Sequence, residues 1–203
     1  MRRFDPADHP HAEVYRLMIG AIVPRPIAFV STVDASGVRN LAPFSYFTAC
    51  SSNPPVVCFS PTVRTGPVPF KDTLRNIQAT GEFVVNIVSE EFAEQMNACS
   101  ADVAPEVDEF ELSGLTPLAS DLVRPPRVGE SHVQMECRLH QLITVSDKPG
   151  GGYLVLGEVL RFHVDEAVLV DGKIDPGRLK AIGRMGGPTY TRTNDRFNMI
   201  RPK

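Results

Sequence analysis

The sequence predicts a mainly β protein, a closed antiparallel barrel with a few peripheral helices. Three observations lead to this fold class: expected strands outnumber expected helices, the links between consecutive strands are short, and the βαβ alternation of a parallel nucleotide-binding sheet is absent. The chain has 203 residues, of which 42% are hydrophobic and 22% are charged. These values are ordinary for a soluble globular protein, and we expect a single domain over residues 1–203.

The first two expected elements are a helix and a hairpin. An amphipathic helix is expected over His11–Gly20, with Val14, Leu17 and Met18 on one face. In the hairpin at 25–47, the run at 27–32 alternates like a half-buried strand, and a glycine at position 37 supplies the positive φ of a tight turn. Beyond the turn, residues 40–48 alternate small polar with large apolar side chains. We therefore expect this second strand to form one wall of a binding site for a flat, partly polar ligand.

The middle of the chain is expected to alternate strands with helices. A strand at 56–60 precedes a proline-rich loop at 61–70, which cannot be helical. A helix then begins at Lys71-Asp72-Thr73, with Asp72 or Thr73 as its cap, and ends at Gly81. A strand follows at 82–88.

A second helix of this region is expected to begin at Ser89. It places Phe92, Met96 and Cys99 on one apolar stripe, which we expect to face the core. The acidic segment at 102–114 is expected to lie on the surface.

The last third is expected to form a long antiparallel hairpin and a short helix. Apolar and polar residues alternate from 133 to 139, so that one face of this strand is expected to be polar. Residues 148–152 turn the chain and 153–164 return it, and Asp171-Gly172 predicts another turn. Asp175-Pro176 predicts the start of a short helix that ends at Gly183–Gly187.

Composition and missing motifs exclude several classes of function. The net charge of −3 provides no bulk attraction to nucleic acid or membrane. No segment approaches the roughly 20 apolar residues that cross a bilayer, and the N-terminus lacks the apolar run of a signal peptide, so we expect a cytoplasmic protein. The four cysteines lack a Cys-x-x-Cys spacing, the five histidines do not cluster, and no hydrolase, zinc-protease or nucleotide-loop motif occurs.

Hydroxyl and cationic side chains gather near the expected helix start at Lys71. Unpaired backbone N–H groups and the positive end of a helix dipole favour phosphate there, next to Arg64, Thr65, Lys71 and Thr73. Further hydroxyls come from Ser45, Thr48, Ser51 and Ser52. The spacing fits equally well an alternative in which the hydroxyls cap turns and the cations are solvated. A bound redox cofactor would account for the missing catalytic triad, since the cofactor carries the chemistry.

Four motifs follow one another over nearly the whole chain. They are RPIAFVSTVDASGVRNLAPFSYF at 25–47, KDTLRNI at 71–77, EFVVNIV at 82–88 and GRMGGPTY at 183–190. Each is weak alone, but in this order they resemble the flavin reductase-like, FMN-binding split-barrel family, which includes flavoredoxins and the reductase partners of two-component monooxygenases. The resemblance implies a six-stranded antiparallel split β-barrel with peripheral helices, assembled as a homodimer with FMN in the subunit interface.

The resemblance also implies which residues hold FMN. Contacts to the ring and ribityl chain are expected from Asn40, Ala42, Ser45, Tyr46, Phe47 and Thr48. Residues near the phosphate are expected to be Ser51, Ser52, Lys71, Asp72 and Thr73. Arg184 and Tyr190 are expected to approach the flavin from the end of the chain. The loop at 64–70 departs from the short basic turn of the family, so no phosphate role for Arg64 or Thr65 is implied.

The implied activity is that of an NAD(P)H:flavin oxidoreductase. NADH or NADPH would stack over FMN and pass a hydride to its N5 atom, and the electrons would go to a small-molecule acceptor or a monooxygenase partner. Hydride transfer needs no general acid or base, so no residue is assigned that role. The alternative is an FMN carrier or electron-transfer flavoprotein, similar to flavoredoxin, without efficient reaction with NAD(P)H. A more distant alternative is a structural barrel that binds no cofactor.

Overall fold

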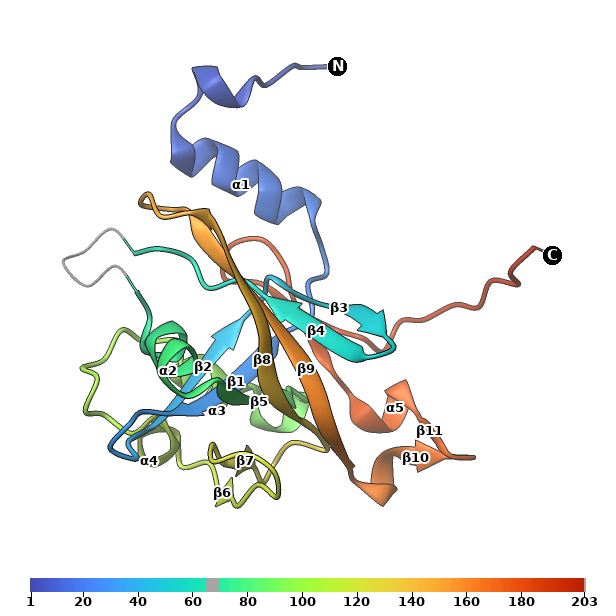
Figure 1. The fold of residues 1–203 in the computed structure, drawn as a ribbon. Helices are drawn as coiled ribbons and strands as arrows, with labels where there is room; N and C mark the ends of the chain where they lie inside the picture. The colour runs from blue at the N-terminus through green and yellow to red at the C-terminus, as the bar shows by residue number, and fades with distance from the viewer. Residues whose placement is uncertain (65–69, 203) are drawn as a thin grey trace.

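One antiparallel sheet of seven strands organises the computed structural model, which describes residues 1–64 and 70–202. In order across the sheet, the strands are β2 (Arg39–Phe44), β1 (Ala28–Val33), β5 (Glu82–Ile87), β8 (Val133–Ser146), β9 (Gly152–Val164), β4 (Pro55–Phe59) and β3 (Phe47–Ser52). Figure 1 shows a strongly twisted sheet, with the long β8–β9 hairpin running through its middle. Every ladder is antiparallel. The predicted mainly β, antiparallel fold is confirmed, with seven strands in the sheet rather than six.

Short helices surround this sheet. They are α1 (His11–Ala21), α2 (Asp72–Thr80), α3 (Ala93–Ala98), α4 (Glu109–Ser113) and α5 (Pro176–Leu179), with single 3-10 turns η1 (Pro6–Asp8), η2 (Glu90–Phe92) and η3 (Glu166–Val168). The described residues also form three two-stranded ribbons: β6 (Pro117–Leu118) with β7 (Arg127–Val128), β10 (Leu169–Val170) with β11 (Lys173–Ile174), and β12 (Ile182–Arg184) with β13 (Tyr190–Arg192). Figure 1 shows α1 standing beyond one end of the sheet, whereas α2, α3 and α4 pack near β1 and β2. Among the described residues, no helix has both the length and the apolar character needed to span a bilayer.

Two apolar clusters pack against opposite faces of β1. Val30 belongs to the first, together with Phe59 and Phe83, whereas Phe29 belongs to the second, which includes Phe110. Fully burying such a side chain stabilises a fold by about 1.5–3 kcal/mol. Because η2, α3 and α4 supply the second cluster, β1 is buried along its whole length, and the expectation of a half-buried strand is wrong.

Two polar segments bury part of their side chains, although most of the segment at 102–114 lies on the surface as expected. In β8, Gln134 and Glu136 are 6% and 0% exposed, because the segment between β6 and β8 covers this face and hydrogen-bonds to both side chains. In the segment at 102–114, α4 buries Glu109 and Phe110, which are 5% and 1% exposed. The alternating pattern of β8 could not show that polar side chains would meet a covering loop.

The helix boundaries partly agree with the sequence. α2 ends as expected at Gly81, whose φ is 71°, and the Asp175 side chain accepts hydrogen bonds from the first N–H groups of α5 as expected. The predicted cap of α2 is wrong, because the N-cap is Lys71 and its side chain makes no capping bond. The predicted end of α5 at 183–187 is also wrong, because Lys180 adopts the left-handed conformation directly after Leu179.

The remaining differences concern α1, β3 and the proline-rich loop. α1 has the expected extent and the stripe Phe92–Met96–Cys99 is buried as expected. However, Leu17 and Met18 of α1 are nearly half exposed. β3 was not expected as a separate strand. In the loop at 61–70, residues 61–64 are not helical, and residues 65–69, including Thr65, lie outside the described residues.

Candidate functional site

A cavity of about 570 Å³ lies where α1, the β1–β2 hairpin, the start of α2, α3 and the β12–β13 ribbon meet. Its lining combines flat apolar surfaces with cations and small polar groups. The residues are Tyr15, Ile19, Arg25, Ile27, Pro43, Ser45, Lys71, Met96, Asn97, Ser100, Arg184, Gly187 and Tyr190. Three are cationic, and no carboxylate is found among the described residues that line it. We call it the basic cavity.

Arg25 is the most buried of the three cations, with 5% of its surface exposed. Its Nη1 donates to the carbonyl oxygens of Ile19 (2.8 Å) and Ile22 (2.7 Å) at the end of α1, and its Nη2 donates to that of Met185 (2.9 Å). Its Nε lies 3.4 Å from Ser45 Oγ. These bonds fix the guanidinium between α1, β12 and the hairpin but leave its charge without a counter-ion.

Lys71 and Arg184 supply the other two positive charges. Burial, followed by the nearby charge of Arg64, lowers the pKa of Lys71. Its Nζ lies 5.5 Å from the centre of the Phe44 ring, and Cζ of Arg184 lies 4.4 Å from the centre of the Tyr190 ring. Within the described part of the chain, none of the three cations forms an ion pair. A partly desolvated cavity with three unpaired cations favours an anionic ligand.

The structure brings four of the residues nominated from the sequence to this cavity: Ser45, Lys71, Arg184 and Tyr190. Three others, Asn40, Ala42 and Thr73, are buried away from its lining. Tyr46 and Phe47 are partly buried, and Thr48, Ser51 and Ser52 are exposed on the edge strand β3. Asp72 forms an ion pair with Arg75 on its own helix, and Arg64 pairs with Asp102 over 2.7 Å.

Sequence reasoning missed Arg25, which it placed in the barrel wall. A signal was present, because this arginine stands between two prolines directly ahead of an apolar strand, where a solvated charge is not expected. Of the other cavity residues, Asn97 lies between Met96 and Cys99 of the apolar stripe and Ser100 directly follows it, and nothing in their spacing pointed to a ligand.

Asn40 and Thr73 belong instead to a buried polar network between α2, β1, β2 and α4. Asn40 Nδ2 donates to Glu109 Oε1 (2.8 Å), and Asn40 Oδ1 accepts from Thr73 Oγ1 (2.8 Å). Leu41 N donates to Glu109 Oε2 (3.0 Å). Thr73 is two residues from Lys71, so this network fixes the start of α2 beside the basic cavity.

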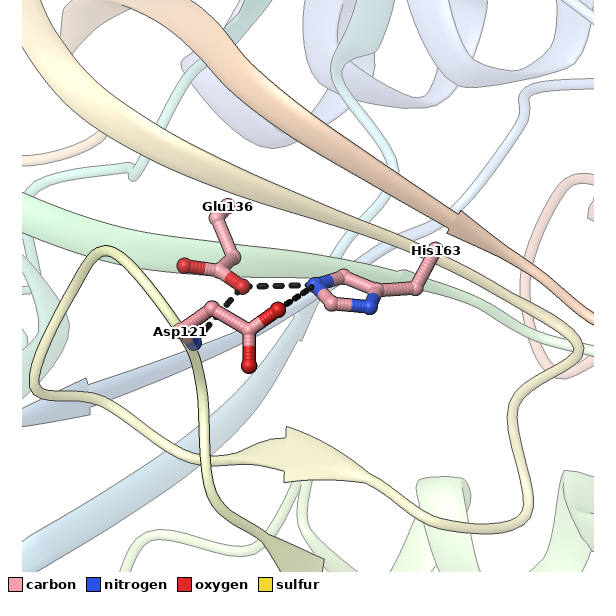
Figure 2. Close-up of side chains that lie close together, drawn as sticks. All are labelled: Asp121, Glu136 and His163. Atoms are coloured by element: carbon pink, nitrogen blue, oxygen red, sulfur yellow. Dashed lines mark hydrogen bonds and ion pairs between the residues drawn. The ribbon is translucent and has the colours of Figure 1, made fainter.

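A second group of titratable side chains, Asp121, Glu136 and His163, lies on β8, β9 and the loop before β7 (Figure 2). His163 Nε2 is 2.6 Å from Glu136 Oε1 and 3.9 Å from Asp121 Oδ2. Their ligand atoms lie within 4.8 Å of one another. The two oxygens of Glu136, however, already accept hydrogen bonds from the N–H groups of residues 121, 122 and 123, and Asp121 pairs with Arg161 over 2.7 Å.

These hydrogen bonds and the ion pair occupy the carboxylate lone pairs that would otherwise bind a metal ion. Burial raises the pKa of Glu136, but the hydrogen bonds from Asp121 N and His163 outweigh it and lower the pKa overall. We infer that Asp121, Glu136 and His163 hold the loop at 119–125 against the sheet.

Comparison with known proteins identifies a family. The model of the flavin reductase-like domain matches residues 19–177. The crystal structure of nitrilotriacetate monooxygenase component B from Bacillus cereus superimposes with a TM-score of 0.92, at 37% identity over 98% of each chain. That of the 2-nitrobenzoate 2-nitroreductase from Pseudomonas fluorescens superimposes with a TM-score of 0.86, at 30% identity over 99% of this chain and 96% of its own. An uncharacterized protein from Halalkalibacterium halodurans is 37% identical over 98% of this chain and 96% of its own length.

Proposed function

The chain belongs to the family of flavin reductase-like domains, and on that premise we propose that it binds FMN in the basic cavity and acts as an NAD(P)H-dependent flavin reductase. The observation that carries the proposal is the presence of Arg25, Lys71 and Arg184 in one cavity with no carboxylate among its described residues. FMN combines a phosphate dianion with a flat, partly polar ring, and a cavity of about 570 Å³ with cationic and flat apolar walls suits both.

The residues divide naturally between binding and orientation. Ile27, Pro43 and Met96 offer apolar surface to a ring, and Ser45 offers a hydroxyl whose oxygen lies 3.4 Å from Arg25 Nε. Lys71 and Arg184 are placed to attract negative charge. Bound FMN supplies the redox chemistry, because it accepts a hydride from a reduced nicotinamide and passes the electrons on. Three cations around the cavity would stabilise an increase in negative charge inside it.

We propose that the active form is a homodimer. β3 lies at the edge of the sheet, and its side chains Thr48, Ser51 and Ser52 are exposed although the sequence resemblance assigns them to the ligand. The apolar Leu17 and Met18 of α1 are exposed at the same time. Burial of both surfaces against a second copy would bring β3 hydroxyls next to a cofactor. Sedimentation of the purified protein as a monomer at micromolar concentration would contradict this assembly.

The electron acceptor is proposed to be a small molecule or a monooxygenase partner. The names of the two solved relatives support either kind, since one is a component of a monooxygenase and the other a nitroreductase. The alternative, a flavin carrier without efficient NAD(P)H reaction, would have the same cavity.

The first test is spectroscopic. Purified protein mixed with FMN should show a perturbed flavin spectrum, and anaerobic addition of NADH or NADPH should bleach it. Flavin that binds but is not bleached by either nucleotide would favour the carrier, and a protein that does not bind FMN would contradict both.

A pair of lysine variants tests the position of the site. Lys71→Gln should weaken FMN binding about tenfold, because it removes one charged partner of an anion. Lys148→Gln changes an exposed lysine in the β8–β9 turn and should leave the affinity unchanged. Equal affinities for the two variants would place the flavin elsewhere.

A further inference from the structure

A second cavity, of about 330 Å³, shares Asn97 and Tyr190 with the basic cavity. It lies between the segment η2–α3 and the β12–β13 ribbon. Its lining includes the apolar Ala93 and Ile182 and the carboxylates of Glu90 and Glu94. We call it the acidic cavity.

The two shared residues form the boundary between the cavities. Tyr190 Oη donates to Asn97 Oδ1 over 3.1 Å, and Arg184 of the basic cavity stacks on the Tyr190 ring. An elongated ligand that occupies both cavities would therefore cross this tyrosine next to a cation.

The cavities differ sharply in charge. The basic cavity has three cations and no carboxylate among its described residues. In the acidic cavity, the charge of Glu90 is balanced by an ion pair with Arg192. Glu94, in contrast, is exposed and forms no ion pair with any described residue. The acidic cavity is thus suited to hydroxyl groups, which donate to a carboxylate, and unsuited to a phosphate.

Resting on the proposed function, we propose that the acidic cavity binds the adenosine half of the nicotinamide dinucleotide and selects NADH over NADPH. The two nucleotides differ by one phosphate on the adenosine 2′ oxygen. A carboxylate that accepts a hydrogen bond from the 2′ hydroxyl favours NADH, and the same carboxylate repels the phosphate dianion of NADPH. Glu94 is the selecting residue, and the Tyr190 ring and Ile182 offer apolar surface for the base.

The position of the Arg184 charge also suits the pyrophosphate in the middle of the dinucleotide. Its pyrophosphate links two nucleosides, and the Arg184 guanidinium stacks on the ring that separates the two cavities. Arg192 also lines the acidic cavity, but its charge is offset by the ion pair with Glu90, so the cavity keeps the negative charge of Glu94.

Binding of adenosine fragments tests this inference without flavin chemistry. Calorimetric titration of the full chain in saturating FMN, which occupies the basic cavity under the proposed function, should show binding of 5′-AMP and about tenfold weaker binding of adenosine 2′,5′-bisphosphate. Glu94→Gln should reduce that ratio several-fold by improving the affinity for the bisphosphate. Glu166→Gln, which changes an exposed glutamate of η3 outside both cavities, should leave the ratio unchanged.

Three outcomes would overturn the inference: failure of 5′-AMP to bind, tighter binding of the bisphosphate by the unmodified chain, or an unchanged ratio in Glu94→Gln. None depends on hydride transfer. A protein that prefers 5′-AMP but never allows a nucleotide to bleach FMN would retain the adenosine site and refute the reductase function instead.

Discussion

Asn40 and Glu109 are joined by a buried hydrogen bond of 2.8 Å from Asn40 Nδ2 to Glu109 Oε1. The two residues are 69 positions apart, and their bond ties α4 to the second strand of the hairpin. The same asparagine accepts a hydrogen bond from Thr73, which follows Lys71 at the start of α2. The position of Lys71 in the wall of the basic cavity therefore depends on the Glu109 carboxylate, which lies outside that cavity.

Removal of that carboxylate should destabilise the fold. Glu109→Ala leaves the buried donors Asn40 Nδ2 and Leu41 N without their acceptor, and each unsatisfied buried group costs about 1–3 kcal/mol. We expect the free energy of unfolding in a urea titration to fall by about 2–4 kcal/mol. The matched control is Glu111→Ala, an exposed glutamate of the same helix whose side chain is 79% exposed. A similar loss in both variants would show that the network adds little.

The stability of the wild type relative to Glu109→Gln should rise as the pH falls. Burial raises the pKa of Glu109 above its ordinary value of 4.5, and hydrogen bonds from Leu41 and Asn40 oppose the shift. Between the ordinary and the raised pKa, the folded state binds more protons than the unfolded chain, so stability increases toward lower pH. Urea titrations of both proteins between about pH 7 and pH 4 measure this difference. A constant difference across that range would contradict the raised pKa.

The opposite slope is expected for Glu136. Its pKa is lowered overall, because the hydrogen bonds to its carboxylate outweigh burial. The stabilisation is therefore fully present above the ordinary value of 4.5 and is lost as the pH falls through the folded pKa. Relative to Glu136→Gln, the wild type should lose stability on acidification. The readout is the opposite sign of the pH dependence of stability at Glu109 and Glu136. General acid unfolding affects the Glu109→Gln and Glu136→Gln variants in the same way and cannot produce opposite signs.

The strands of the barrel could be predicted because they depend on local patterns. The turn at Gly37, the apolar run of β5 and the glycine turn of the β8–β9 hairpin each leave a signal within a few residues. The burial of β1 on both faces could not be predicted, since it depends on α3 and α4, which come 60 or more residues later along the chain. β3 was missed because its small polar side chains are typical of a loop.

Prediction of the site was limited in the same way, by contacts between residues that are far apart in the sequence. Ser45, Lys71, Arg184 and Tyr190 were nominated by motif and do line the basic cavity. Asn40 and Thr73 stand in the same motifs, yet their polar groups are engaged by Glu109 and by one another. A motif specifies that a polar residue is required, but only the packing of distant elements decides whether it contacts a ligand or another side chain.

Cys50 should be the only cysteine that reacts readily with a thiol reagent in the folded single chain, and burial of β3 in the proposed homodimer should slow that reaction. It is exposed on β3, whereas Cys58, Cys99 and Cys137 are buried. Burial raises the pKa of Cys58 and of Cys99 to about 11 and also raises that of Cys137, and the thiolate is the reactive form. Titration with a chromogenic disulfide should therefore modify one thiol per chain, and Cys50→Ser should abolish the reaction. Rapid modification of a second thiol would contradict the packing of β4, of β8 or of the end of α3, which carry Cys58, Cys137 and Cys99.

Arg25 should contribute to ligand affinity through both its charge and its shape. Its guanidinium donates to three backbone carbonyls from two segments, a geometry that the single ammonium of lysine cannot reproduce. Arg25→Lys keeps the charge but frees the end of α1, so we expect FMN affinity to fall about tenfold even in that conservative variant. Arg25→Gln also removes the charge and should lower the affinity further, with a weaker dependence on salt. Fluorescence titration of FMN at low and high ionic strength separates the two effects. Wild-type affinity in Arg25→Lys would mean that only the charge matters, and a wild-type salt dependence in Arg25→Gln would place the anion away from this residue.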